Sequence, residues 1–103
     1  MNNTQSNKNI DLIVNNLEEY LTFIKSKFTF IHNSNFFFRD FHYATKMFLE
    51  EHSIKTSYQK AEIMARAISL ILEQQNIFKR IDHQSWMLNY PKFALPKVEK
   101  KVA

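Results

Sequence analysis

The sequence predicts a mainly α-helical domain, in which three helices form a core and a small β-hairpin completes the fold. Apolar residues recur every three or four positions through most of residues 10–76, and beyond that point they alternate with polar ones. With 103 residues, 45% of them apolar, the chain suffices for one domain and is too short for two. We therefore expect a flexible leader at 1–9, a domain at 10–91 and a basic tail at 92–103.

The first helix is predicted to run from Ile10 to Phe28. Its apolar stripe comprises Ile10, Ile13, Val14, Leu17, Leu21, Ile24 and Phe28. Asn9 is expected to cap this helix, because an Asn side chain accepts hydrogen bonds from the first free N–H groups. Leu12 and Phe23 lie off the stripe, so they either widen the buried face or form the interface of a homodimer.

A short β segment is expected next, at 28–31, followed by a turn at 32–35. Because the chain contains no Gly, the two asparagines of that turn are the residues that best tolerate a left-handed backbone. A second helix is expected at 37–52. The three consecutive aromatic residues Phe36–Phe38 are interpreted as core residues.

The third helix has the clearest pattern, and Thr56 or Ser57 is expected to cap it. Its buried stripe comprises Ala61, Met64 or Ala65, Ile68 and Leu72, widened by Ile63, Ala67 and Ile71. Its exposed stripe comprises Gln59, Glu62, Arg66, Ser69 and Glu73. The spacing of Glu62 and Arg66 predicts an ion pair within the helix.

Two strands are predicted at 77–82 and 85–91, joined by His83 and Gln84 at the tip of a hairpin. The buried face of the second strand comprises Trp86, Leu88 and Tyr90. We expect the Trp86 ring in the core, with its indole N–H near solvent.

Missing residue types exclude several classes of function. Without Cys there is no disulfide, thiolate metal site or cysteine nucleophile, and without Gly there is no phosphate-binding loop, dinucleotide fingerprint or nucleophile elbow. The four histidines lack metal-ligand spacing, and no activating pattern surrounds Ser85 beside His83. We therefore expect a non-enzyme with no cofactor, no metal site and no small-molecule ligand.

Charge and hydropathy point to a basic protein of the cell interior. No apolar run approaches the ~20 residues of a membrane span, and the polar N-terminus lacks a signal-peptide core. We expect the cytoplasm, or the nucleus of a eukaryote, and no membrane partner. The net charge of +4 makes nucleic acid the first partner to consider.

The order of the predicted elements resembles the winged-helix family, and the stretch from Ser57 to Pro91 carries most of the resemblance. In that stretch a helix rich in Ala and Ile leads into a basic strand, a polar tip and a return strand with Trp. It is also similar to the end of the DEP domain, a winged-helix relative that docks proteins or membranes. Winged helices commonly carry Gly before the first wing strand and in the wing. Here those positions hold Asn76 and His83–Gln84, so a longer or more strained tip is expected.

The resemblance implies binding of double-stranded DNA, with the third helix in the major groove and the hairpin on the backbone or minor groove. The residues that it places on DNA are Lys55, Ser57, Tyr58, Gln59, Lys60, Arg66, Lys79, Arg80, His83 and Gln84. Arg can bond guanine, Gln can bond adenine, and Lys or Arg suits a phosphate. We expect a transcription regulator, or a replication or mobile-element accessory.

A protein-interaction module without DNA binding is the alternative, because the third helix also carries acidic residues. Convergence of Lys55, Lys60, Lys79 and Arg80 on one surface favours DNA. Scattered charges around an exposed apolar patch favour a protein partner. The predicted tail carries four lysines, Lys92, Lys97, Lys100 and Lys101. They are either solvated or form a basic arm that binds nucleic acid.

Overall fold

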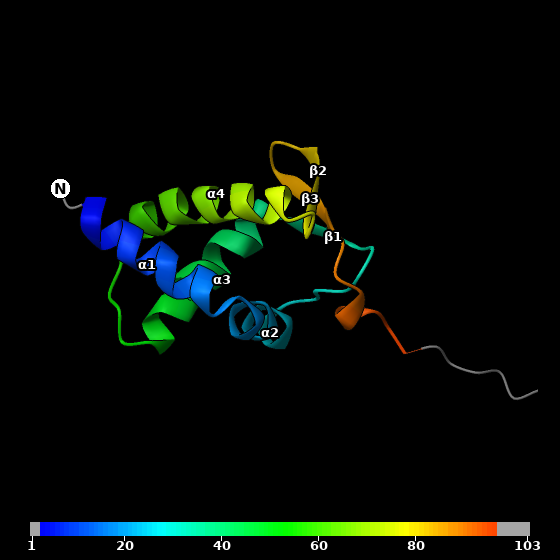
Figure 1. The fold of residues 1–103 in the computed structure, drawn as a ribbon, viewed down its shortest axis with the longest axis horizontal. Helices are drawn as coiled ribbons and strands as arrows, with labels where there is room; N and C mark the ends of the chain where they lie inside the picture. Colours follow the sequence, from blue (N-terminus) through cyan, green and yellow to red (C-terminus); the bar gives the residue numbers. More distant parts are fainter. Residues whose placement is uncertain (1–2, 97–103) are drawn as a thin grey trace, which may run out of the picture.

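The computed structural model describes residues 3–96, and Figure 1 shows their fold. The elements in chain order are α1 (Asn3–Asn15), α2 (Leu17–Lys27), β1 (Asn35–Phe37), α3 (Phe38–Glu51), α4 (Tyr58–Gln74), β2 (Phe78–Asp82), β3 (Ser85–Leu88) and a 3-10 turn (Pro91–Phe93). The fold is mainly helical with a small antiparallel sheet, which confirms the predicted class and is compatible with a helical core plus wing. Hereafter the wing means β2, β3 and the turn between them.

The first predicted helix is two helices, because the chain breaks at Asn16, where φ is −126° and ψ is 42°. Asn15 and Asn16 are both weak helix formers, so helical geometry is least favoured there. The Asn16 amide donates to the Leu12 carbonyl at 2.8 Å and satisfies one end of α1. The expected cap was wrong: Asn9 is buried inside α1, which makes residues 3–9 of the predicted leader helical.

The predicted β segment was also misplaced, because the strand is Asn35–Phe37 and not 28–31. Segment 28–31 is irregular, although Phe30 is fully buried. β1 pairs with β3, so the expected hairpin becomes a three-stranded sheet of order β1-β3-β2. Asn33 takes the left-handed backbone expected in the turn, with φ of 68°, whereas Asn35 lies in the strand.

The hydrophobic core lies between the inner face of the sheet and the helices. Trp86 is fully buried, as expected, and its ring stacks on Phe78 with 4.7 Å between centroids. Phe41 of α3 meets the same indole edge-on at 5.6 Å, and Phe36 of β1 is its partner across the sheet. These contacts fix the sheet against α3 and confirm the predicted phase of the strand around Trp86.

The three consecutive phenylalanines do not share one environment. Phe36 and Phe38 are buried, but Phe37 is exposed, so the expectation of three core residues was wrong for one of them. The reason is the two-residue alternation of β1, which turns Phe37 to the face opposite Phe36.

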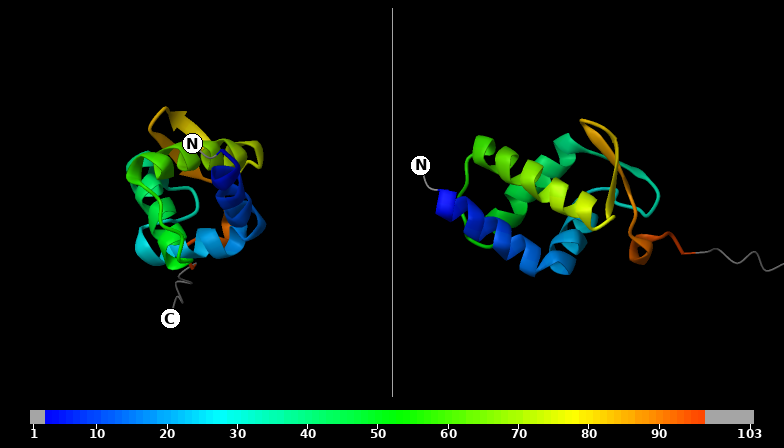
Figure 2. Two further views of the ribbon diagram at one scale, coloured as in Figure 1. Left: turned by 90° about the vertical axis from the view of Figure 1, so that its left-hand side faces the viewer. Right: turned by 45° about the horizontal axis from the view of Figure 1, so that its top comes forward.

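Helices α3 and α4 pack on each other, and α1 lies alongside α4, as Figure 2 shows. Ser57 caps α4 by accepting the Lys60 N–H at 3.1 Å, as expected. The predicted buried stripe is confirmed, but Ile63 was wrongly included and is exposed. Ser69, expected on the exposed stripe, is buried and donates to the Arg66 carbonyl.

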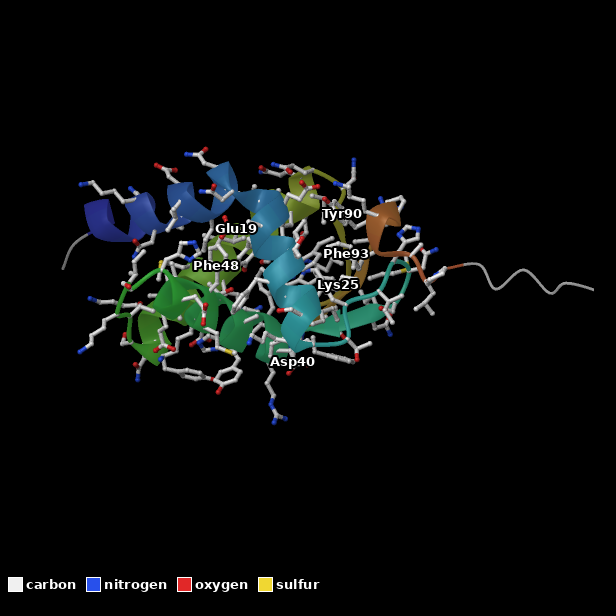
Figure 3. All side chains as sticks on the ribbon, turned by 90° about the horizontal axis from the view of Figure 1, so that it is seen from below. Glu19, Lys25, Asp40, Phe48, Tyr90 and Phe93 are labelled. Atoms are coloured by element: carbon white, nitrogen blue, oxygen red, sulfur yellow. The ribbon has the colours of Figure 1, made fainter. Side chains whose placement is uncertain are left out.

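The core extends past the predicted end of the domain at residue 91. The 3-10 turn brings Phe93 back against Phe30 and Tyr90, and Figure 3 shows Phe93 and Tyr90 beside each other. The His32 N–H donates to the Phe93 carbonyl, and Lys92 pairs with Glu18 of α2. The first residues of the predicted basic tail are therefore part of the fold. The other tail lysines, Lys97, Lys100 and Lys101, lie outside the described residues.

Candidate interaction surface of α4 and the wing

The predicted DNA contacts do not form one basic patch. Lys55 and Lys60 lie at the start of α4, whereas Lys79 and Arg80 lie in β2, beside the opposite end of that helix (Figure 1). Lys60 and Glu73, the helix residue nearest the base of the wing, are separated by about 20 Å along the helix axis. The cations therefore form two separate groups.

The base of the wing is held to α4 by the carboxylate of Glu73. Arg80 donates to it from Nη2 at 2.7 Å and from Nε at 3.3 Å. Trp86 donates its indole N–H to Glu73 Oε2 at 2.9 Å, which corrects the expectation that this group lies near solvent. Arg80, the predicted phosphate contact, is thus neutralised by a two-point ion pair in the free protein.

The tip of the wing is held to the middle of α4 by Arg66. The guanidinium lies 3.5 Å above the ring centroid of Phe38 and donates to the His83 carbonyl at 2.9 Å and to Gln84 Oε1 at 3.4 Å. The predicted ion pair between Glu62 and Arg66 is not formed. The wing is anchored at its base and at its tip, so it is a fixed part of the surface.

The wing turns tightly without glycine. Asn76, between α4 and β2, takes a left-handed backbone with φ of 61°. At the tip, the pairing of β2 with β3 shifts register between Arg80 and Asp82. Asp82 Oδ1 accepts the Gln84 N–H at 2.8 Å and the Ser85 hydroxyl at 2.9 Å, and these bonds lower the pKa of the Asp82 carboxyl.

The remaining residues predicted to contact DNA differ in whether their side chains already contact another part of the protein. The Ser57 hydroxyl is occupied by its capping bond, and the Tyr58 ring stacks on His42 with 3.9 Å between centroids. Four exposed side chains have no ion-pair or hydrogen-bond partner among residues 7–96: those of Lys55, Gln59, Lys60 and Lys79.

Two apolar residues that sequence reasoning did not assign to a surface lie in the middle of the exposed face of α4. Ile63 is 65% exposed and Leu70 is 53% exposed. Seven residues make nearly two helical turns, so both side chains lie on the same side of α4. The partly buried Ala67 lies between them. The seven-residue spacing of Ile63 and Leu70 could have identified this pair in the sequence. The pair was missed because apolar residues occur on several sides of α4 and not in one narrow stripe.

Within residues 3–96, no group of three or more His, Asp or Glu side chains could hold a metal ion. The helices in that range are all too short or too polar to cross a bilayer.

Comparison with models of known protein families, with curated proteins and with solved structures gives no match. The function must therefore be inferred from the geometry of the chain itself.

Proposed function

We propose that the chain is a protein-interaction module that docks a partner on the exposed face of α4. The observation that carries this proposal is the pair Ile63 and Leu70, two large apolar side chains exposed on one helix face. In a DNA-reading helix this face meets base edges and phosphates, to which Ile and Leu donate no hydrogen bonds; their contacts there are limited to the thymine methyl group. The apolar area they leave in water favours burial against another protein.

The partner we infer is an amphipathic helix of a different protein, with its apolar stripe on Ile63, Ala67 and Leu70. A second copy of this chain fits less well. Antiparallel pairing of α4 with itself, which sets Ile63 against Leu70 of the second copy, centres on residues 66 and 67. The two Arg66 guanidinium groups would then lie close to each other, and like charges at an interface are unfavourable.

Double-stranded DNA is the second candidate, in the role of a regulator or a replication or mobile-element accessory. It is supported by the net charge of +4 and by the side chains of Lys55, Lys60 and Lys79, which have no partner within residues 7–96. Arg80 would join them only if its ion pair with Glu73 opened, and Arg66 only if it left the wing tip. DNA binding is therefore ranked second.

The experiment starts with a photo-reactive residue placed at position 63 in cells, followed by purification of the cross-linked protein. The purified partner is then titrated with the parent chain and with Ile63→Ala and Leu70→Ala. We expect each substitution to weaken binding roughly tenfold, as expected for a central interface residue. Since both side chains are exposed, neither change should lower the melting temperature.

Leu95→Ala is the matched control, because Leu95 is an apolar residue as exposed as Ile63 but lies outside α4. The control should bind the partner as the parent does. If all three variants bind equally well, or if position 63 cross-links to no protein, the proposed docking face is wrong.

A further inference from the structure

A second surface lies on the first turns of α3, next to the first residue of α4 and the tip of the wing. Two hollows open there, of about 360 and 400 Å³, within the range of small-ligand sites. Both are lined by Arg39 and Asp40. Figure 3 labels Asp40, at the start of α3 beside the end of α2. The first hollow is completed by Phe28, Tyr43 and Tyr58, and the second by Phe37 and Gln84.

Three exposed aromatic rings lie on this surface. Phe37, Tyr43 and Tyr58 are each exposed over more than half of their surface. Two of them rest on rings beneath: Tyr58 stacks on the buried His42, and Tyr43 meets Phe28 edge-on with 6.5 Å between centroids. Such support fixes the rings in place, so a planar ligand that stacks on them would order little of the protein.

One cation and one anion, Arg39 and Asp40, line both hollows. Arg39 is exposed and has no ion-pair partner among residues 7–96. It lies in the first turn of α3, where the helix dipole adds positive potential. Asp40 and Gln84 supply hydrogen-bond groups at the walls of the hollows.

We propose that this surface binds single-stranded nucleic acid, with one base in each hollow and the linking phosphate on Arg39. Stacking on aromatic rings beside a cation is how proteins hold unpaired bases. A duplex fits poorly, because its bases already stack on one another and hide their faces. The Asp40 carboxylate can accept a hydrogen bond from an amino group or a ring N–H of a base.

The test is fluorescence anisotropy with a short labelled single strand of mixed sequence, at several salt concentrations. Phe37→Ala and Tyr43→Ala should each weaken binding about tenfold, the loss expected for one stacked base. Tyr43→Phe keeps the ring and should bind like the parent. Arg39→Ala should weaken binding and flatten the slope of log affinity against log salt by about 0.7, the value for one phosphate of a single strand.

The controls are Ile63→Ala and Leu70→Ala, which should bind the strand as the parent does and so separate this site from the docking face of α4. A duplex of the same length should bind more weakly than the single strand. Any of three results would overturn the proposal: no binding of single strands at low salt, equal binding by parent and ring variants, or duplex binding as tight as that of the single strand.

Discussion

At the scale of single residues, Glu73 shows how one side chain connects a helix to two strands. One carboxylate accepts hydrogen bonds from Arg80 in β2 and from Trp86 in β3, so it joins both strands of the wing to α4. Residue types alone predicted that Trp86 would be buried and that Arg80 would be charged and exposed. They could not predict that Glu73 satisfies both, because that contact exists only when the hairpin folds back onto the helix.

Trp86→Ala should lower the free energy of unfolding by about 3–5 kcal/mol, because removing a fully buried indole leaves a cavity among its aromatic neighbours. The Glu73 carboxylate also loses a donor. Chemical denaturation of parent and variant measures the difference. Phe37→Ala is the control, since an exposed ring should cost far less; equal losses for the two variants would show that Trp86 is not a core residue.

Asp82 should make the wing tip sensitive to acid. Its hydrogen bonds from Gln84 and Ser85 favour the carboxylate and lower its pKa in the folded state, whereas the unfolded chain has the ordinary value of about 3.9. The stabilisation is therefore complete above the unfolded-state pKa and is lost as pH falls through the lower folded-state pKa. We expect the Gln84 amide resonance to shift over that acid range in the parent, and this titration to be absent in Asp82→Asn. A Gln84 resonance that does not respond to acid would contradict the bond.

At the scale of elements, helices and the hairpin were predictable wherever local periodicity decides the structure. The expected second helix at 37–52 differs from α3 by one residue at each end, and α4 starts after its predicted cap, Ser57. Two features depend on more than local pattern. β1 is defined by pairing with β3, some fifty residues later in the chain, and the break at Asn16 interrupts an apolar stripe that continues across it.

The junction between α4 and the wing depends on the left-handed backbone of Asn76. Asn76→Ala should destabilise the fold by about 1 kcal/mol, because Cβ sterics penalise this conformation and Ala lacks the local hydrogen bonds by which Asn offsets the cost. Asn76→Gly should be neutral or slightly stabilising, since Gly adopts positive φ readily. Thermal melts of the two variants provide the comparison. If Ala is tolerated as well as Gly, the left-handed turn is not required at this junction.

At the scale of the whole molecule, the two proposed surfaces are formed by different residues. One is the apolar face of α4, and the other is the aromatic and basic surface on α3. The sequence identified the charged and polar residues that could contact a partner, but their grouping depends on the fold. The length of α4 separates the predicted DNA-binding cations into two groups. Arg66 is bonded to the tip of the wing and Arg80 is paired with Glu73. The residues predicted to bind DNA therefore do not form one patch in the free protein.

The homodimer predicted from Leu12 and Phe23 stays a prediction. Both side chains are half-buried, and Phe23 packs edge-on against Phe48 with 5.5 Å between ring centroids. Phe23 therefore widens the buried face, which was one of its two predicted roles.

The most direct test of the docking surface is to add positive charge to it and to measure binding of both candidate partners. Ile63→Lys and Leu70→Lys should each abolish binding of the cross-linked protein partner. They should change duplex DNA affinity no more than Leu95→Lys, which adds the same charge outside α4. Duplex affinity that rises well above that of the Leu95→Lys control, with binding of the protein partner intact, would contradict the account and show that DNA lies on the exposed face of α4.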